Sequence, residues 1–383
     1  MIYFDHNATS PVMPEARQAW LEATEQFIGN PSSPHRIGAR ADNALTAARE
    51  KLADVLGCDP LDIAWTSGAT ESNNTVLHHF ARSAPAGSEV WISAIEHPCV
   101  LQAAEHYFPA KRRRLIPVTR GGVIDLDWVS EELTEKRPCL VAVMAANNET
   151  GVLQPWREAR AICAQYEVPF FCDSVQWLGK LPSKGLGECD FLTGCAHKFG
   201  GPRGIGFLKC PAKSRLQPLL FGGRQEEGRR PGTENVAGAL SMMAALEARE
   251  KALAAREHTG RLGYREAFEK RMLESLPGAQ VVGTGQKRLW NTVSALMPEA
   301  SQHRWVVKLD KLGFAVSTGS ACSTGKEEPS HVLSAMGFQP QEAGRVLRFS
   351  SGWETEPRNW DALAEALLKV YLDAHPVKTR TAA

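Results

Sequence analysis

The chain has 383 residues and a formal net charge of +1, from 44 lysines and arginines against 43 aspartates and glutamates. Hydrophobic residues make up 43% of it and charged residues 23%, which is the balance of an ordinary globular enzyme. A chain of this length is expected to form two domains. Because the net charge is close to zero, we expect no direct binding of nucleic acid and no attraction to an anionic membrane.

Nine cysteines are scattered along the chain without any CxxC pair. Their odd number and irregular spacing indicate free thiols in a reducing compartment, and we expect no metal site. No apolar stretch approaches the ~18 residues of a membrane span, and the first residues lack the pattern of a secretion signal. We therefore expect a cytoplasmic protein that does not enter a membrane.

Between about residues 45 and 210, segments of helical periodicity alternate with short apolar runs that we interpret as strands. These runs are residues 63–66, 90–92, 140–144, 169–172, 191–193 and 204–208. Such alternation predicts an α/β fold with a largely parallel sheet covered by helices on both faces. A long helical stretch over residues 236–275 and looser strand and helix patterns follow, with a final helix near 360–373, which indicate a smaller α+β domain.

Polar segments come directly after five of the predicted strands, at residues 67–74, 94–100, 145–151, 173–176 and 194–198. Ligands of open α/β sheets bind at the carboxyl ends of the strands, so these segments are expected to converge on one site. In the first of them, Gly68 leads into a helix whose free N–H groups, together with the Thr70 hydroxyl, suit a phosphate. Taken alone, the same segment is equally an ordinary capped helix.

Lys198 follows a predicted strand within a glycine-rich turn among apolar neighbours. A desolvated lysine has a lowered pKa and forms Schiff bases readily, although most His-Lys pairs lie on the solvated surface. Asp173 also ends an apolar run, where its carboxylate would be buried unless a cation met it. A protonated pyridine nitrogen is such a cation, and the two residues together suggest pyridoxal phosphate (PLP).

With these residues in view, the chain resembles the class V aminotransferase family of fold-type I PLP enzymes, and within it the cysteine desulfurases of the NifS/IscS group. The matching segments run in order over nearly the whole chain: residues 3–9, 29–33, 66–74, 96–97, 147–151, 173–176, 197–198, 230–235, 319–322 and 348–350. The resemblance implies a large PLP-binding domain over residues 15–255 with a mostly parallel seven-stranded sheet. Residues 1–14 and 256–383 would form the small domain, with a catalytic cysteine loop at about 316–328.

The resemblance also implies a role for each residue that would hold the ring of the cofactor. Lys198 would bind PLP covalently, Asp173 would pair with the pyridine nitrogen, and Gln176 would hydrogen-bond the ring hydroxyl. His97 would stack on the ring and, with Lys198, would act in catalysis. Taken singly, His97 could instead cap the following helix, and Gln176 could satisfy backbone groups at the strand end.

Further residues would hold the phosphate and the substrate. Ala69, Thr70, Cys195 and His197 would contact the phosphate, and Thr233 would reach the phosphate of a second subunit, which implies a homodimer. Asn148 and Arg348 would hold the carboxylate of L-cysteine, although Arg348 taken alone could pair with a surface acid.

Cys322 lies in a stretch of small residues from 316 to 325 that offers nothing apolar to pack against, so we expect a mobile, exposed loop. By the resemblance, Cys322 would take the sulfur of L-cysteine as a persulfide and leave L-alanine. The sulfur would then pass to an acceptor protein such as an iron–sulfur scaffold or a thiolation relay.

The chain departs from the family pattern at three positions. Cys195 stands where the family has a hydroxyl residue, and a thiol is the poorer donor. Arg224 and Glu227 stand where we expect a glycine and an arginine, close to the dimer-facing loop. The alternatives to a cysteine desulfurase are a selenocysteine lyase, another class V aminotransferase, and a non-catalytic PLP-binding subunit.

Overall fold

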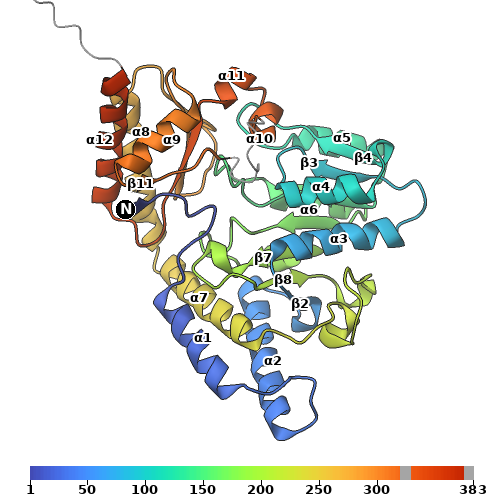
Figure 1. Cartoon of the computed structure of the whole chain (residues 1–383). Helices are drawn as coiled ribbons and strands as arrows, with labels where there is room; N and C mark the ends of the chain where they lie inside the picture. The colour runs from blue at the N-terminus through green and yellow to red at the C-terminus, as the bar shows by residue number, and fades with distance from the viewer. Residues whose placement is uncertain (320–328, 375–383) are drawn as a thin grey trace, which may run out of the picture.

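The computed structural model describes residues 1–319 and 329–374, and its centre is a seven-stranded sheet of order β2-β8-β7-β6-β5-β3-β4 (Figure 1). The strands are β2 (Ile63–Thr66), β3 (Val90–Ser93), β4 (Arg113–Ile116), β5 (Leu140–Ala142), β6 (Phe170–Asp173), β7 (Phe191–Cys195) and β8 (Gly206–Lys209). The pairings of β8 with β2 and β7 are antiparallel, and the other pairings are parallel. The predicted mostly parallel seven-stranded sheet is confirmed.

Residues along each strand alternate between two apolar layers, because successive side chains of a strand point to opposite faces. On β3, Trp91 joins the layer of α2 (Arg36–Leu56), α5 (Leu126–Glu135), α6 (Trp156–Gln165) and α7 (Val236–Ala254). Val90 and Ile92 join the opposite layer with α3 (Ala69–Ser83) and α4 (Pro98–Tyr107). Since both faces are buried, the strands read as continuous apolar runs, and polar side chains gather at the strand ends.

The helical stretch predicted over residues 236–275 is two helices rather than one. α7 ends at Ala254 and α8 spans Glu257–Ser275. Between them Arg256 takes a left-handed conformation with φ of 59°, which no glycine or proline announces in the sequence. The expectation of one continuous helix is therefore wrong.

A second group of elements packs around its own core. β1 (Ile2–Tyr3) pairs in parallel with β11 (Phe314–Ala315), and β9 (Gln280–Val281), β10 (Thr292–Leu296) and β12 (Val346–Ser350) form an antiparallel sheet. Helices α8, α9 (Gln302–Lys311) and α12 (Pro357–Ala374) cover them, and the N-terminus lies beside β11 (Figure 1). The chain then leads from β1 towards the central sheet, and α1 (Pro14–Gln26) packs near α7.

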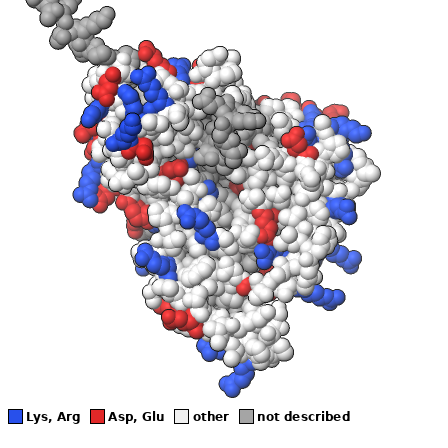
Figure 2. Space-filling view, viewed as in Figure 1, with Lys and Arg blue, Asp and Glu red and all other residues white. Residues whose placement is uncertain are grey.

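Two short helices, α10 (His331–Ala335) and α11 (Pro340–Ala343), complete the described part of the chain. Within the described residues, no helix is long and apolar enough to cross a membrane. Lysine and arginine side chains are interspersed with aspartates and glutamates on the face drawn in Figure 2, which agrees with the balanced charge of the sequence.

Candidate active site

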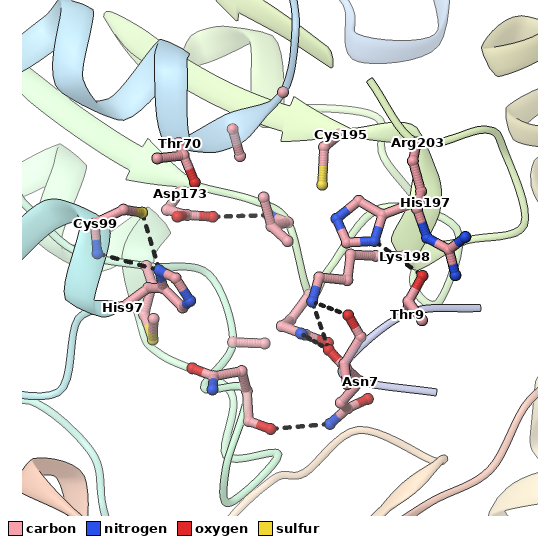
Figure 3. Close-up of a pocket in the computed structure, with 18 of the residues that line it drawn as sticks. Asn7, Thr9, Thr70, His97, Cys99, Asp173, Cys195, His197, Lys198 and Arg203 are labelled. Atoms are coloured by element: carbon pink, nitrogen blue, oxygen red, sulfur yellow. Dashed lines mark hydrogen bonds between the residues drawn. The ribbon is translucent and has the colours of Figure 1, made fainter. Parts of the chain in front are cut away.

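A cavity of about 570 Å³ opens where the carboxyl ends of β2, β3, β5, β6 and β7 meet the segment after β1 (Figure 3). Because β8 runs in the opposite direction, the turn before it, with Arg203 and Gly204, reaches the same edge. Ten residues predicted for the site line this cavity: Ala69, Thr70, His97, Asn148, Asp173, Gln176, Cys195, His197, Lys198 and Arg348. The expectation that the polar strand ends converge is confirmed.

Lys198 ends a short 3-10 turn, Ala196–Lys198, that follows β7 directly. Its Nζ donates to the backbone carbonyls of Asn7 and Ala8, both at 2.7 Å (Figure 3). The Ser10 hydroxyl also donates to the Lys198 carbonyl at 3.1 Å. The segment after β1 therefore holds the lysine at the wall of the cavity.

Asp173, the last residue of β6, has a carboxylate that is only 6% exposed. Asn73 Nδ2 donates to its Oδ2 at 2.8 Å, and the Val175 N–H donates to its Oδ1 at 3.0 Å. Asn73 is itself fixed by the Thr193 hydroxyl, which donates to its Oδ1 at 2.6 Å. Both partners of the carboxylate are neutral, so the site suits a cationic ligand atom placed against Asp173.

His97 is the N-cap of α4, as its simpler interpretation expects, and it also lines the cavity. Its Nδ1 accepts from the Cys99 N–H at 3.2 Å and lies 2.9 Å from Cys99 Sγ (Figure 3). Burial lowers the pKa of His97 and raises that of the Cys99 thiol to about 12. A neutral thiol donates to Nδ1, so the proton of the neutral imidazole sits on Nε2.

The first turn of α3 lies at the other end of the cavity, with no side-chain cap at its N-cap residue Gly68. Strand β8 passes very close, since a Cβ on Gly206 would lie 2.8 Å from Gly68 Cα and 2.5 Å from the Gly194 carbonyl oxygen. Only glycine at position 206 allows this approach. The first turn of α3 with Thr70 therefore suits an anion at this end of the cavity.

Cys195 and His197 complete this end of the cavity as neutral groups. Burial raises the pKa of the Cys195 thiol to about 12, and the thiol accepts the Ala69 N–H. Burial lowers the pKa of His197 to about 4, and its Nδ1 lies 3.1 Å from the Thr9 hydroxyl (Figure 3).

Arg348 lies on β12 with 2% of its surface exposed, and it pairs with a partly buried acid rather than a surface one. Its Nη2 donates to Asp5 Oδ1 at 2.6 Å, and its Nη1 donates to the carbonyls of Asn148 at 3.0 Å and Gly319 at 3.3 Å. Among the described residues, its Nε has no hydrogen-bond partner. The guanidinium therefore keeps a free N–H donor and lines the cavity close to Asn148.

Two predicted site residues are not among the ten that line the cavity. Thr233 is exposed and lines a smaller cavity beside Trp65 and Ser67. Cys322 lies outside the described residues. At the two departures near Thr233, Arg224 has an ordinary φ of −92°, so no glycine is required there, and Glu227 is left-handed with φ of 57°.

Sequence reasoning gave no role to several residues that the fold brings to the cavity. They are Asn7, Thr9, Cys99 and Arg203, with Asn73 behind Asp173 and Lys180 behind Asn7 and Gln176. Asn7 and Thr9 fall within a segment that matches the family, and this was the signal available for them. Cys99 and Lys180 gave no signal of their own.

The residues at the cavity fit PLP. The cavity offers a lysine amine for the aldehyde of PLP, a buried carboxylate with neutral partners for the ring nitrogen, and uncapped helix N–H groups for the phosphate. An α/β fold with a mostly parallel sheet and a lysine site of this kind defines a PLP-dependent enzyme of fold type I.

The family described as "Aminotransferase class-V" matches residues 2–363, and the chain belongs to this family. It is 38% identical over 369 residues to a cysteine desulfurase of Klebsiella pneumoniae, covering 96% of this chain and 91% of that protein. The X-ray structure of a NifS-like protein from Rickettsia africae ESF-5 matches with a TM-score of 0.87, at 31% identity over 97% of this chain and 99% of that one. A structure of SspA in complex with cysteine matches with a TM-score of 0.79, at 29% identity over 91% of this chain and 98% of that one.

Proposed function

We propose that the chain is a PLP-dependent cysteine desulfurase, which converts L-cysteine to L-alanine and transfers the sulfur to Cys322. The observation that carries this proposal is the convergence of Lys198, Asp173 and Arg348 on one cavity, in a chain that is 38% identical over 96% of its length to a named cysteine desulfurase. The likeness to SspA in complex with cysteine supports cysteine as the substrate.

PLP, when bound, would supply an electron sink for the carbanion formed at the substrate Cα. Lys198 would hold its aldehyde carbon through Nζ and, once displaced by the substrate amine, would move the Cα proton. The carbonyls of Asn7 and Ala8 hold Nζ at the cavity wall and would keep the released amine within reach. Asp173 would keep the ring nitrogen protonated, which strengthens the electron sink.

His97 would lie against the ring and carry its proton on Nε2, because Nδ1 is occupied by Cys99. Its lowered pKa keeps the imidazole neutral at neutral pH, so it would serve as a hydrogen-bond donor or proton relay rather than as a fixed cation. Gln176 would donate to the ring hydroxyl. Thr70, Ala69, Cys195 and His197 would hold the phosphate.

Arg348 and Asn148 would hold the substrate carboxylate, and Gly319, the last described residue before Cys322, lines the same end of the cavity and accepts from Arg348. The Cys322 thiolate would attack the substrate sulfur, so that an S–S bond forms while the substrate C–S bond breaks and Cβ takes a proton. The persulfide would then pass its outer sulfur to an iron–sulfur scaffold or a thiolation relay.

We further propose that residues 15–255 form the large domain and that residues 1–14 and 256–383 form the small domain. Two separate apolar cores support this division: one includes Leu45 and Leu246, and the other includes Phe4 and Leu367. A homodimer in which Thr233 reaches the phosphate of the partner agrees with its exposed position outside the cavity. The described cysteines form no disulfide, which supports a cytoplasmic location.

The test is to incubate the purified, PLP-loaded protein with L-cysteine and a thiol reductant and to measure sulfide and alanine. A cysteine desulfurase gives the two in equal amounts, and Lys198→Ala gives neither. A selenocysteine lyase would release alanine from L-selenocysteine and none from L-cysteine. Another class V aminotransferase would give a keto acid without sulfide, and a non-catalytic subunit would give no product.

A further inference from the structure

Lys180 is a buried lysine directly behind the wall of the active site. It is 3% exposed and lies four residues after Gln176, in the segment that follows β6 and Asp173. Its backbone carbonyl accepts from the Trp290 indole at 2.8 Å. The turn before it depends on Gly179, which has φ of 68° and would place a Cβ 2.3 Å from the Phe199 Cβ. Lys180 is therefore held firmly in this position.

The amine of Lys180 donates to two neutral amide oxygens. Its Nζ lies 3.0 Å from Asn7 Oδ1 and makes a very short contact with Gln176 Oε1. The nearby charges that act on Lys180 belong to Lys198 and Arg348, and both are positive. A buried amine among cations is costly, which suggests a function other than stability.

These contacts fix the orientation of the Gln176 amide from both ends. At one end the Lys180 amine donates to the Gln176 oxygen, as it does to Asn7 Oδ1. At the other end Gln176 Nε2 donates to the Asn7 carbonyl at 3.0 Å, and a carbonyl only accepts. The same holds for Asn7, whose Nδ2 donates to the Asn148 carbonyl at 3.1 Å and whose Oδ1 faces Lys180. Both amides therefore have one permitted orientation.

One hydrogen of Gln176 Nε2 is used by the Asn7 carbonyl, and the oxygen is used by Lys180. The second N–H is then the one polar group that Gln176 has left to offer to the cavity it lines. An amide that can only donate favours an anionic oxygen opposite it and disfavours a hydroxyl that must donate.

We propose that Lys180 is a positioning residue of the PLP site. It fixes the Gln176 amide in the orientation that donates to the ring oxygen. It also holds the side chain of Asn7, whose backbone carbonyl accepts from Lys198 Nζ. The proposal rests on the proposed function only in requiring that PLP binds to Lys198. A fixed donor opposite the ring oxygen stabilises that oxygen as an anion without the proton of the Lys198 nitrogen. That nitrogen therefore loses its proton at a lower pH than it otherwise would.

The test is the pH titration of the visible absorption of bound PLP in the variant Lys180→Met, which keeps an unbranched side chain up to the ε position and removes the donor. We expect the pH midpoint for loss of the proton on the PLP-bound Lys198 nitrogen to rise by about one unit or more, which is a tenfold change in its proton affinity. We also expect PLP to dissociate several-fold faster on dialysis. Lys209→Met is the matched control, because Lys209 is also buried, at 6% exposed, and does not line the cavity. Its Nζ donates to the Cys189 carbonyl over a distance of 2.8 Å.

Gln176→Glu provides a second test if Lys180→Met does not fold, because a carboxylate keeps Lys180 satisfied and offers no donor to the ring. The same rise of the midpoint is expected. If Lys180 acts through Gln176, the shifts of Lys180→Met and Gln176→Ala are not additive in the double variant.

A midpoint equal to that of the wild type, in Lys180→Met or Gln176→Glu protein that holds PLP, overturns the proposal, as does an equal rise in Lys209→Met. Wild-type protein that binds no PLP at Lys198 would refute the proposed function instead.

Discussion

Cys195 gives a sharp test of how the cavity holds PLP, since this chain has a thiol where its family has a hydroxyl. The side chain is 2% exposed and lies at the end of β7, where it accepts the Ala69 N–H beside the first turn of α3. Because burial raises its pKa to about 12, the thiol is neutral at every pH at which the protein would be studied. Cys195→Ser changes a weak donor into a good one at an otherwise unchanged position.

The size of the effect follows from hydrogen-bond energies. A hydrogen bond to a charged group contributes about 1.5–3 kcal/mol, and a thiol donor supplies only part of this. Cys195→Ser should therefore strengthen PLP binding by about 1 kcal/mol, which is about fivefold in the dissociation constant. The buried hydroxyl should not cost much stability in the holoprotein, since the phosphate and the Ala69 N–H are both at hand.

The measurement is equilibrium dialysis of PLP against wild-type and Cys195→Ser protein. Cys163→Ser is the matched control, because Cys163 is fully buried in α6 and does not line the cavity. This control should lose stability and keep the affinity for PLP. An unchanged affinity in Cys195→Ser would show that position 195 does not contact the phosphate.

Three further predictions concern charge at the site. Asp173→Asn keeps the size of the side chain and one of its two acceptor oxygens, and should lower the turnover of cysteine at least about a hundredfold by weakening the electron sink; wild-type turnover would contradict this. Asp5→Asn removes the ion-pair partner of Arg348 and should lower the free energy of unfolding, measured in urea, by about 2 kcal/mol. An unchanged urea midpoint would refute the pairing. Burial lowers the pKa of His6 from 6.5 to about 4, so the unfolded chain takes up a proton at a higher pH than the folded chain does. The free energy of unfolding should therefore fall by about 3 kcal/mol as the pH is lowered from 6.5 to 4. His6→Asn should reduce this fall, and an equal fall in the variant would exclude His6 as its source.

The sheet was largely predictable because its strands are buried on both faces and read as apolar runs. β4 is the exception, since it begins with Arg113 and Arg114 at the edge of the sheet. The Arg114 guanidinium lies 5.2 Å from the Trp91 ring and 4.9 Å from the Trp128 ring, so it joins the packed layer as a cation on aromatic faces. The sequence pattern indicates only a charged turn at this point.

The site was predictable where chemistry follows directly from a strand end, as at Asp173 and Lys198. It was not predictable where the fold brings together residues far apart in the chain, as with Asn7 and Lys180. Single polar residues of this kind have no periodicity or spacing to mark them. Their role becomes visible only when the hydrogen-bond partners are known.

The central claim is that sulfur leaves L-cysteine and is bound by Cys322. The most direct test is to incubate PLP-loaded protein with ³⁵S-labelled L-cysteine without reductant, and then to measure protein-bound label and released alanine. Wild-type protein should retain thiol-releasable ³⁵S in an amount equal to the alanine formed. Cys322→Ser should bind PLP and cysteine, retain no label after the protein is denatured and freed of bound cysteine, and release no alanine. Undiminished alanine from Cys322→Ser, or label that persists in it, would contradict the account.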